Sequence, residues 1–111
     1  MTVEYDRELY RLKADLCKSF ADPTRLSIIN ELRDGEKLVG QLVEALNIAQ
    51  SAVSRHLALL RERGVVTFRR EGTRVYYRLS DPKIEEACDI LHRILMDQIA
   101  RNRSLADWLT P

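Results

Sequence analysis

Two groups of side chains in this 111-residue sequence could do chemistry, and the first consists of thiol and imidazole groups. Cys88 and His92 are four residues apart, so on a helix they would occupy neighbouring positions of one surface. Cys17 lies on a predicted first helix, which we expect next to the last helix. Thiolate and imidazole are ligands that zinc prefers, so the three residues could form a metal site. The two cysteines could instead form a redox pair.

The alternative is that these residues have no chemical role. Cysteine is among the most buried residue types, so Cys17 and Cys88 could be small core residues, with His92 at the surface. Neither a CxC nor a CxxC cluster supports metal capture, and two cysteines are too few for a disulfide scaffold. We therefore expect no required cofactor, and sensing through a metal ion or a thiol stays an open, unsupported hypothesis.

The second group consists of polar and basic residues between positions 50 and 80. The formal net charge of the chain is only +1, yet residues 50–80 contain seven arginines and two glutamates, and both flanking segments have an excess of acidic residues. Such a concentration of positive charge is typical of proteins that bind a polyanion. The charge distribution therefore favours nucleic acid as the partner.

Hydrophobic periodicity predicts the elements that position these residues. Asp22-Pro23 indicates a helix start, because Asp can cap the helix and Pro loses nothing at the first position. Leu26, Ile29 and Leu32 would form the inward face of that helix. The pattern alternates between 65 and 79 around Gly72, which predicts a β-hairpin. The chain should thus be mostly α, in the order helix 4–21, helix 22–34, helix 39–46, helix 50–63, strand 65–70, strand 74–79 and helix 82–103.

Helices 39–46 and 50–63 with the hairpin after them have the arrangement of a winged helix-turn-helix. If Val53, Leu57 and Leu60 point inward, Ser51 and Arg55 fall on the opposite face of the helix. Gln50 and Ser54 lie near its leading edge and flank, and these four residues can enter a major groove. Arg there favours guanine, Gln favours adenine and Ser suits phosphate, while the arginines of the wing grip phosphates or enter the minor groove. The predicted DNA-binding residues are Gln50, Ser51, Ser54, Arg55 and His56 in the helix, and Arg69, Arg70, Thr73 and Arg74 in the wing (residues 65–79). His56 is expected to pack or to contact phosphate rather than to bind a metal.

The sequence also resembles the arsenic-repressor family of regulators, the ArsR/SmtB type. The resemblance rests on three ordered blocks, Phe20–Leu26, Gln50–Leu57 and Arg69–Tyr77. It implies one winged helix-turn-helix domain over residues 1–111, acting as a homodimeric repressor. Such a dimer would bind an inverted repeat over a promoter and leave it in response to a small effector or a redox or metal signal.

The first and last helices would join the two protomers. A chain this short has little core to cover two terminal apolar stripes internally, so a symmetric partner is the expected cover. The predicted dimer interface consists of Leu9, Leu12 and Leu16 in helix 4–21, and Leu91, Leu95 and Ile99 in helix 82–103.

Several positions depart from the family pattern. Leu38 and Ala49 stand where members commonly have Ser or Thr, so side-chain capping of the third and fourth helices should be absent or shifted. Residues 36–40 contain no cysteine, unlike members that sense metals ahead of the third helix. Where other members have metal ligands on the last helix, this chain has Asp81, Lys83, Ile94 and Asp97, so two ligands are missing and Lys83 adds a repelling cation. Where others have a pair of cysteines, it has Asn30 and Met96, so we expect that switch to be absent.

The sequence lacks the features that would indicate a membrane protein, a secreted protein or an enzyme. No apolar run is long enough to span a bilayer, and the N-terminal segment is unlike a secretory signal. We therefore expect a cytoplasmic protein that does not associate with a membrane. A glycine-rich phosphate loop and a GxSxG motif are both missing, so we do not expect an enzyme. The alternative is a winged-helix protein-protein interaction module, which would need apolar anchors where Gln50, Ser51 and Arg55 stand.

Overall fold

The computed structural model describes the backbone of residues 3–109 and the side chains of residues 6–103. The predicted domain of residues 1–111 thus extends two residues beyond the described backbone at each end. The elements are α1 (Val3–Lys18), α2 (Pro23–Glu31), η1 (Leu32–Asp34), β1 (Lys37–Leu38), α3 (Val39–Leu46), α4 (Gln50–Glu62), β2 (Val66–Glu71), β3 (Arg74–Leu79) and α5 (Pro82–Leu109). The chain divides into two units, residues 1–81 and residues 82–111, and each is described by itself.

Local chemistry explains where the helices of the first unit begin and end. The Asp22 side chain accepts a hydrogen bond from the Arg25 N–H at 3.1 Å and caps α2, and Pro23 follows at the first helical position, as predicted. α1 ends at Lys18 rather than near Ala21, because three hydrogen bonds of the i to i−3 type turn the chain at residues 19–21.

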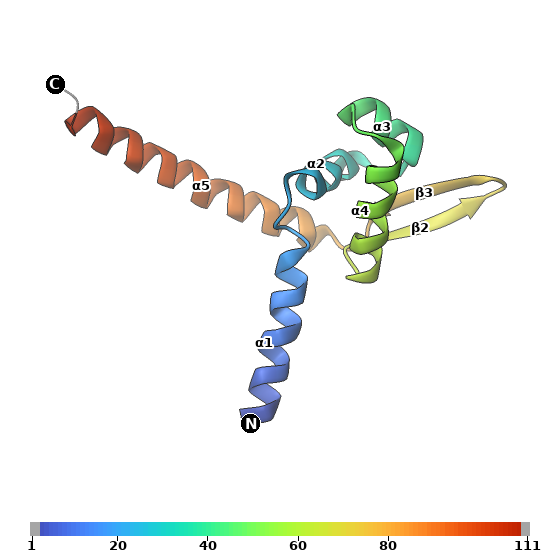
Figure 1. The fold of residues 1–111 in the computed structure, drawn as a ribbon, viewed down its shortest axis with the longest axis horizontal. Helices are drawn as coiled ribbons and strands as arrows, with labels where there is room; N and C mark the ends of the chain where they lie inside the picture. Colours follow the sequence, from blue (N-terminus) through green and yellow to red (C-terminus); the bar gives the residue numbers. More distant parts are fainter. Residues whose placement is uncertain (1–2, 110–111) are drawn as a thin grey trace. The chain divides into compact units, whose positions relative to one another are not determined.

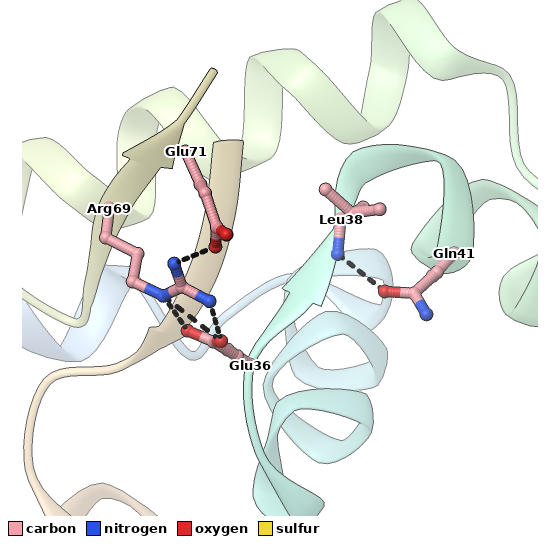
Figure 2. A network of polar contacts seen from close by, with 5 residues as sticks. All are labelled: Glu36, Leu38, Gln41, Arg69 and Glu71. Atoms are coloured by element: carbon pink, nitrogen blue, oxygen red, sulfur yellow. Dashed lines mark hydrogen bonds and ion pairs between the residues drawn. The ribbon is translucent and has the colours of Figure 1, made fainter. Parts of the chain in front are cut away.

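The ends of α3 confirm that its side-chain cap is missing. Leu38 offers no acceptor, but the Gln41 side chain accepts from the Leu38 N–H at 2.8 Å and replaces part of the cap (Figure 2). Asn47 ends α3 in the left-handed conformation, with φ of 54°. This residue makes the tight turn into α4, which also begins without a side-chain cap, at Ala49.

The sheet has three strands in the order β1-β3-β2, all antiparallel. The hairpin was predicted, and its register pairs Glu71 with Arg74 across a tip in which Gly72 has a φ of 63°. The third strand was not predicted, because its two residues, Lys37 and Leu38, are too few to show an alternating pattern.

The core of the first unit lies where α2, α3, α4 and the sheet meet. In Figure 1 these three helices gather near the base of the β2-β3 hairpin, whose tip extends away from them. The buried apolar side chains are Ile28, Ile29, Leu32, Leu42, Val53, Leu57, Leu60, Val65 and Val66. The prediction that Leu26 belongs to this core is wrong, since Leu26 is 39% exposed. The buried face of α2 and η1 is centred on Ile28, Ile29 and Leu32, which leaves Leu26 to one side.

The second unit is α5, whose 28 residues run past the predicted end at 103. Large apolar side chains recur along it at helical spacing and are 41–51% exposed: Ile90, Leu91, Ile94, Leu95, Met96 and Ile99. None of the helices within the described residues is both long and apolar enough to cross a membrane.

Candidate nucleic-acid interface

α4 presents a polar face directly opposite its buried stripe. Val53, Leu57 and Leu60 are fully buried, which fixes the rotation of the helix about its own axis. Ser51 and Arg55 lie on the other side of the helix, Gln50 and Ser54 lie at its start and flank, and all four are exposed. Ala49 has no side-chain acceptor, so its side chain does not cap the first N–H groups of α4. These N–H groups point out of the N-terminus of the helix, where an anion could accept hydrogen bonds from them. The structure therefore brings four of the predicted contact residues together.

The wing adds exposed residues at the hairpin, but its arginines differ in their surroundings. Arg70, Thr73 and Arg74 are exposed, and among the described side chains neither Arg70 nor Arg74 has an acidic partner within 4.0 Å. The Arg70 guanidinium lies 5.6 Å from the centre of the Phe68 ring, and that of Arg61, from α4, lies 4.1 Å from it. Phe68 thus links the wing to the end of α4 through cation–π contacts.

Arg69 is engaged by two carboxylates, which the sequence did not predict (Figure 2). Its Nε donates to Glu36 Oε2 at 2.9 Å, and its Nη1 donates to Glu71 Oε2 at 2.7 Å. The guanidinium also lies over the Tyr76 ring, 4.3 Å from the ring centre. The hydrogen bond from Arg69, supported by its charge, holds the pKa of Glu36 below its ordinary value, and both acids raise the pKa of Arg69.

The Glu36–Arg69 pair joins the wing to the start of the helix-turn-helix. β1 explains the encounter, because Leu38 and Arg69 both pair with Tyr76, from opposite sides of β3. Glu36 precedes that short strand and so comes within reach of the Arg69 side chain. Arg69 thus connects the wing to the segment that precedes α3, in addition to being one of the predicted contact residues of the wing.

His56 lies differently from the other predicted contact residues of α4. Its side chain is only 13% exposed, and its Nε2 is 3.9 Å from Asp22 Oδ2. Its Nδ1 is 3.4 Å from Arg25 Nη1. The ring is thus directed at the start of α2 rather than outward with Ser51 and Arg55.

The thiol and imidazole residues gather into no metal site within the described part of the chain. No group of three or more His, Cys, Asp or Glu side chains there could hold a metal ion. Cys17, in α1, is exposed, so the alternative that both cysteines are buried core residues is wrong for it, and Cys88, in α5, is half-buried. His92 is exposed, as a surface histidine would be.

The predicted dimer residues lie on two apolar surfaces, one on each of two helices. In α1, Leu12 is 54% and Leu16 is 48% exposed, whereas Leu9 is half-buried. In α5, Leu91, Leu95 and Ile99 form part of the exposed stripe described above. Large apolar side chains exposed at regular helical spacing are typical of a surface that another molecule covers.

Comparison with known proteins identifies the relatives of this chain. Residues 22–67 match the model of the family described as "Bacterial regulatory protein, arsR family". The HTH-type transcriptional repressor SmtB of Mycobacterium tuberculosis is 41% identical over 75 residues, 68% of this chain but only 56% of SmtB. The transcriptional activator HlyU of Vibrio cholerae is 42% identical over 79 residues, which are 71% of this chain and 73% of HlyU.

A solved structure agrees with the fold. The homodimeric winged helix-turn-helix DNA-binding domain of Mb0332 from Mycobacterium bovis, a possible ArsR-family regulator, superimposes with a TM-score of 0.81. Its sequence is 26% identical, and the match covers 90% of this chain and 93% of that fragment. The winged helix-turn-helix predicted from the sequence is thus confirmed.

Proposed function

Because the chain belongs to the arsR family of bacterial regulatory proteins, we propose that it is a transcriptional regulator, not an enzyme, that binds duplex DNA as a homodimer. One observation carries the proposal: the face of α4 opposite the buried stripe is polar, the N-terminus of α4 has no side-chain cap, and an arginine-bearing wing belongs to the same unit. A protein partner would need apolar anchors on that face, so the interaction module is disfavoured.

α4 is the element that reads bases. Its length and exposed polar face suit the major groove, where the Arg55 fork matches the O6 and N7 acceptors of guanine and Gln50 matches adenine. Ser51, Ser54 and the uncapped N–H groups at the start of the helix suit phosphate oxygens. Specificity would therefore depend mainly on Arg55 and Gln50.

The wing supplies positioning contacts that do not depend on sequence. Arg70 and Arg74 are the phosphate-binding arginines, and Thr73 at the tip can donate a hydrogen bond to the backbone of the nucleic acid. Arg69 holds the wing to Glu36 and so sets its direction relative to the helix-turn-helix.

Dimerisation through α1 and α5 gives the protein two reading helices. The exposed apolar stripes of these helices supply the interface, and the homodimeric state of the Mb0332 domain supports this assignment. Two recognition helices of a symmetric dimer meet successive major grooves roughly 34 Å apart, so the operator should be an inverted repeat with that spacing. Bound over a promoter, such a dimer would act as a cytoplasmic repressor, and several relatives are named repressors.

The test is binding of the purified protein to DNA from upstream of its own coding region, measured by fluorescence anisotropy. Arg55→Ala should weaken binding by about 1–3 kcal/mol and relax the preference at one base pair per half-site. The matched control is Arg11→Ala, which removes an arginine from the exposed surface of α1, where it pairs with Glu8 in the preceding turn. Binding of all variants with equal affinity, or no preference of the wild type for any site, would contradict the proposal.

A further inference from the structure

Arg25 connects the end of α1 to the proposed reading helix. Its Nη2 donates to the Lys18 carbonyl at 2.8 Å and its Nε donates to the Ser19 carbonyl at 3.1 Å. These carbonyls lie at the C-terminal end of α1, where a helix leaves its last acceptors without intrahelical partners. The remaining arm of the guanidinium, Nη1, is 3.4 Å from His56 Nδ1 in the middle of α4.

His56 lies between two charged groups of opposite sign, both from α2 or its cap. Arg25 faces Nδ1, and the Asp22 carboxylate faces Nε2 at 3.9 Å. The same carboxylate accepts the Arg25 N–H at 3.1 Å, which is the main reason that its pKa is lowered, with a smaller contribution from His56. His56 immediately precedes Leu57, which is fully buried in the core.

We propose that Arg25 and His56 are positioning residues for DNA recognition, and that protonation of His56 moves α4 away from the position that binds the operator. The proposal rests on the proposed function of α4 as the reading helix. Neither residue touches DNA in this scheme. They act by joining the junction of α1 and α2 to α4, and hence the dimerisation helix to the reading helix.

The change of partner follows from the hydrogen-bonding groups of the ring. A neutral imidazole with a lone pair on Nδ1 accepts from Arg25, whose position is fixed by the Lys18 and Ser19 carbonyls. Protonation removes that lone pair and places a cation beside the guanidinium, while Asp22 attracts the N–H on the other side of the ring. The protonated ring then loses its hydrogen bond with Arg25 and pairs with the Asp22 carboxylate instead. Operator affinity should fall as the pH falls, although the added positive charge alone would strengthen binding to DNA.

The experiment measures the dissociation constant of the dimer and its mapped operator between pH 5.5 and 8.5. Wild type should lose affinity about five- to tenfold on going from pH 8 to pH 5.5. His56→Asn keeps an acceptor near the position of Nδ1 but cannot be protonated there, and it should remove this dependence. The control is His92→Asn, which changes the other histidine of the chain and should behave as wild type.

Arg25→Lys tests the other half of the pair. Lysine keeps the charge but cannot bond two carbonyls and an imidazole with one planar fork, so affinity at pH 8 should fall about tenfold. Because Arg25 touches no phosphate in this scheme, the slope of log affinity against log salt should not change. NMR of the His56 ring in the protein without DNA should show an unprotonated Nδ1 at pH 8 in wild type and a perturbed ring in Arg25→Lys.

The outcomes separate this proposal from the proposed function. If wild type binds DNA and His56→Asn keeps the pH dependence of wild type, the positioning role is wrong while the regulator stands. A salt slope reduced by about one in Arg25→Lys would make Arg25 a phosphate contact and would also overturn the proposal. If wild type prefers no DNA site at all, the proposed function fails first, and the NMR result then shows whether the Arg25–His56 contact exists.

Discussion

The wing offers a sharp prediction, because its arginines have different surroundings within a few residues of one another. Arg70 and Arg74 are exposed without an acidic partner among the described side chains, whereas Arg69 is bound by Glu36 and Glu71. An arginine already paired with carboxylates releases few counterions from DNA, since its charge is largely compensated. We therefore expect Arg70→Ala/Arg74→Ala and Arg69→Ala to weaken DNA binding in different ways.

The size of the difference follows from the number of contacts. Each phosphate neutralised contributes about 0.9 to the slope of log affinity against log salt, so two arginines in each of two protomers contribute about 3.6. Between 50 and 200 mM salt, that slope corresponds to a loss of about 150-fold in affinity. The double variant should lack this part of the salt dependence, and Arg69→Ala should keep it.

Arg69→Ala should still bind more weakly at every salt concentration. The substitution releases the wing from Glu36, so the wing is no longer held in its direction relative to the helix-turn-helix. Fluorescence anisotropy with a mapped operator at four salt concentrations measures both affinity and slope. Glu36→Gln is the matched control, since it breaks the same pair while keeping the arginine. If Arg69→Ala lowers the slope as much per residue as the double variant, Arg69 is a phosphate contact and the distinction is refuted.

The remaining predictions concern stability and assembly. Leu57→Ala should destabilise the fold by about 2–5 kcal/mol in chemical denaturation, since the side chain is fully buried in the core. Ser19→Ala should leave stability unchanged or raise it by up to about 1 kcal/mol, because the buried Ser19 hydroxyl bonds to none of the described groups. Asp22→Asn should lower the melting temperature near pH 6, and the difference from wild type should shrink as the pH falls below about 4. The reason is that the lowered pKa of Asp22 marks stability that is present above its ordinary value and is lost as the carboxylate is protonated. Leu91→Asp/Leu95→Asp should sediment as a monomer while circular dichroism shows a folded chain, because buried unpaired charge opposes the interface; a folded dimer would place the interface elsewhere.

Much of the fold could be predicted because its boundaries are encoded locally. Asp22-Pro23 both caps and begins α2, and the residues after α4 change from helical to alternating periodicity at Gly64. β1 could not be predicted, since its two residues become a strand only by pairing with Tyr76 and Tyr77. The misplacement of Leu26 has a similar origin: which side of α2 is buried depends on how the helix packs, not on its own sequence.

The candidate site was predictable to the extent that it depends on one helix. Periodicity correctly separates the outward Ser51 and Arg55 from the buried stripe, because both sets lie on α4. Arg69 and His56 were assigned by their position in the basic segment. Their partners in the structure lie 33 and 31 residues away, so only the tertiary fold shows that the two side chains are engaged.

The positive charge of residues 50–80 therefore overstates how many arginines can bind DNA directly. The Arg63 Nη1 donates to the Asp15 carbonyl of α1 at 2.9 Å and lies 3.5 Å from its carboxylate, and Arg69 is held by Glu36 and Glu71. In the proposed function, these two arginines orient α4 and the wing, while the exposed Arg55 and Arg74 contact DNA. Because the segment contains both orienting and contacting arginines, we expect substitutions of the two kinds to change DNA binding differently. Loss of an orienting arginine should lower affinity at every salt concentration with little change in slope, and loss of a contacting arginine should change the slope itself.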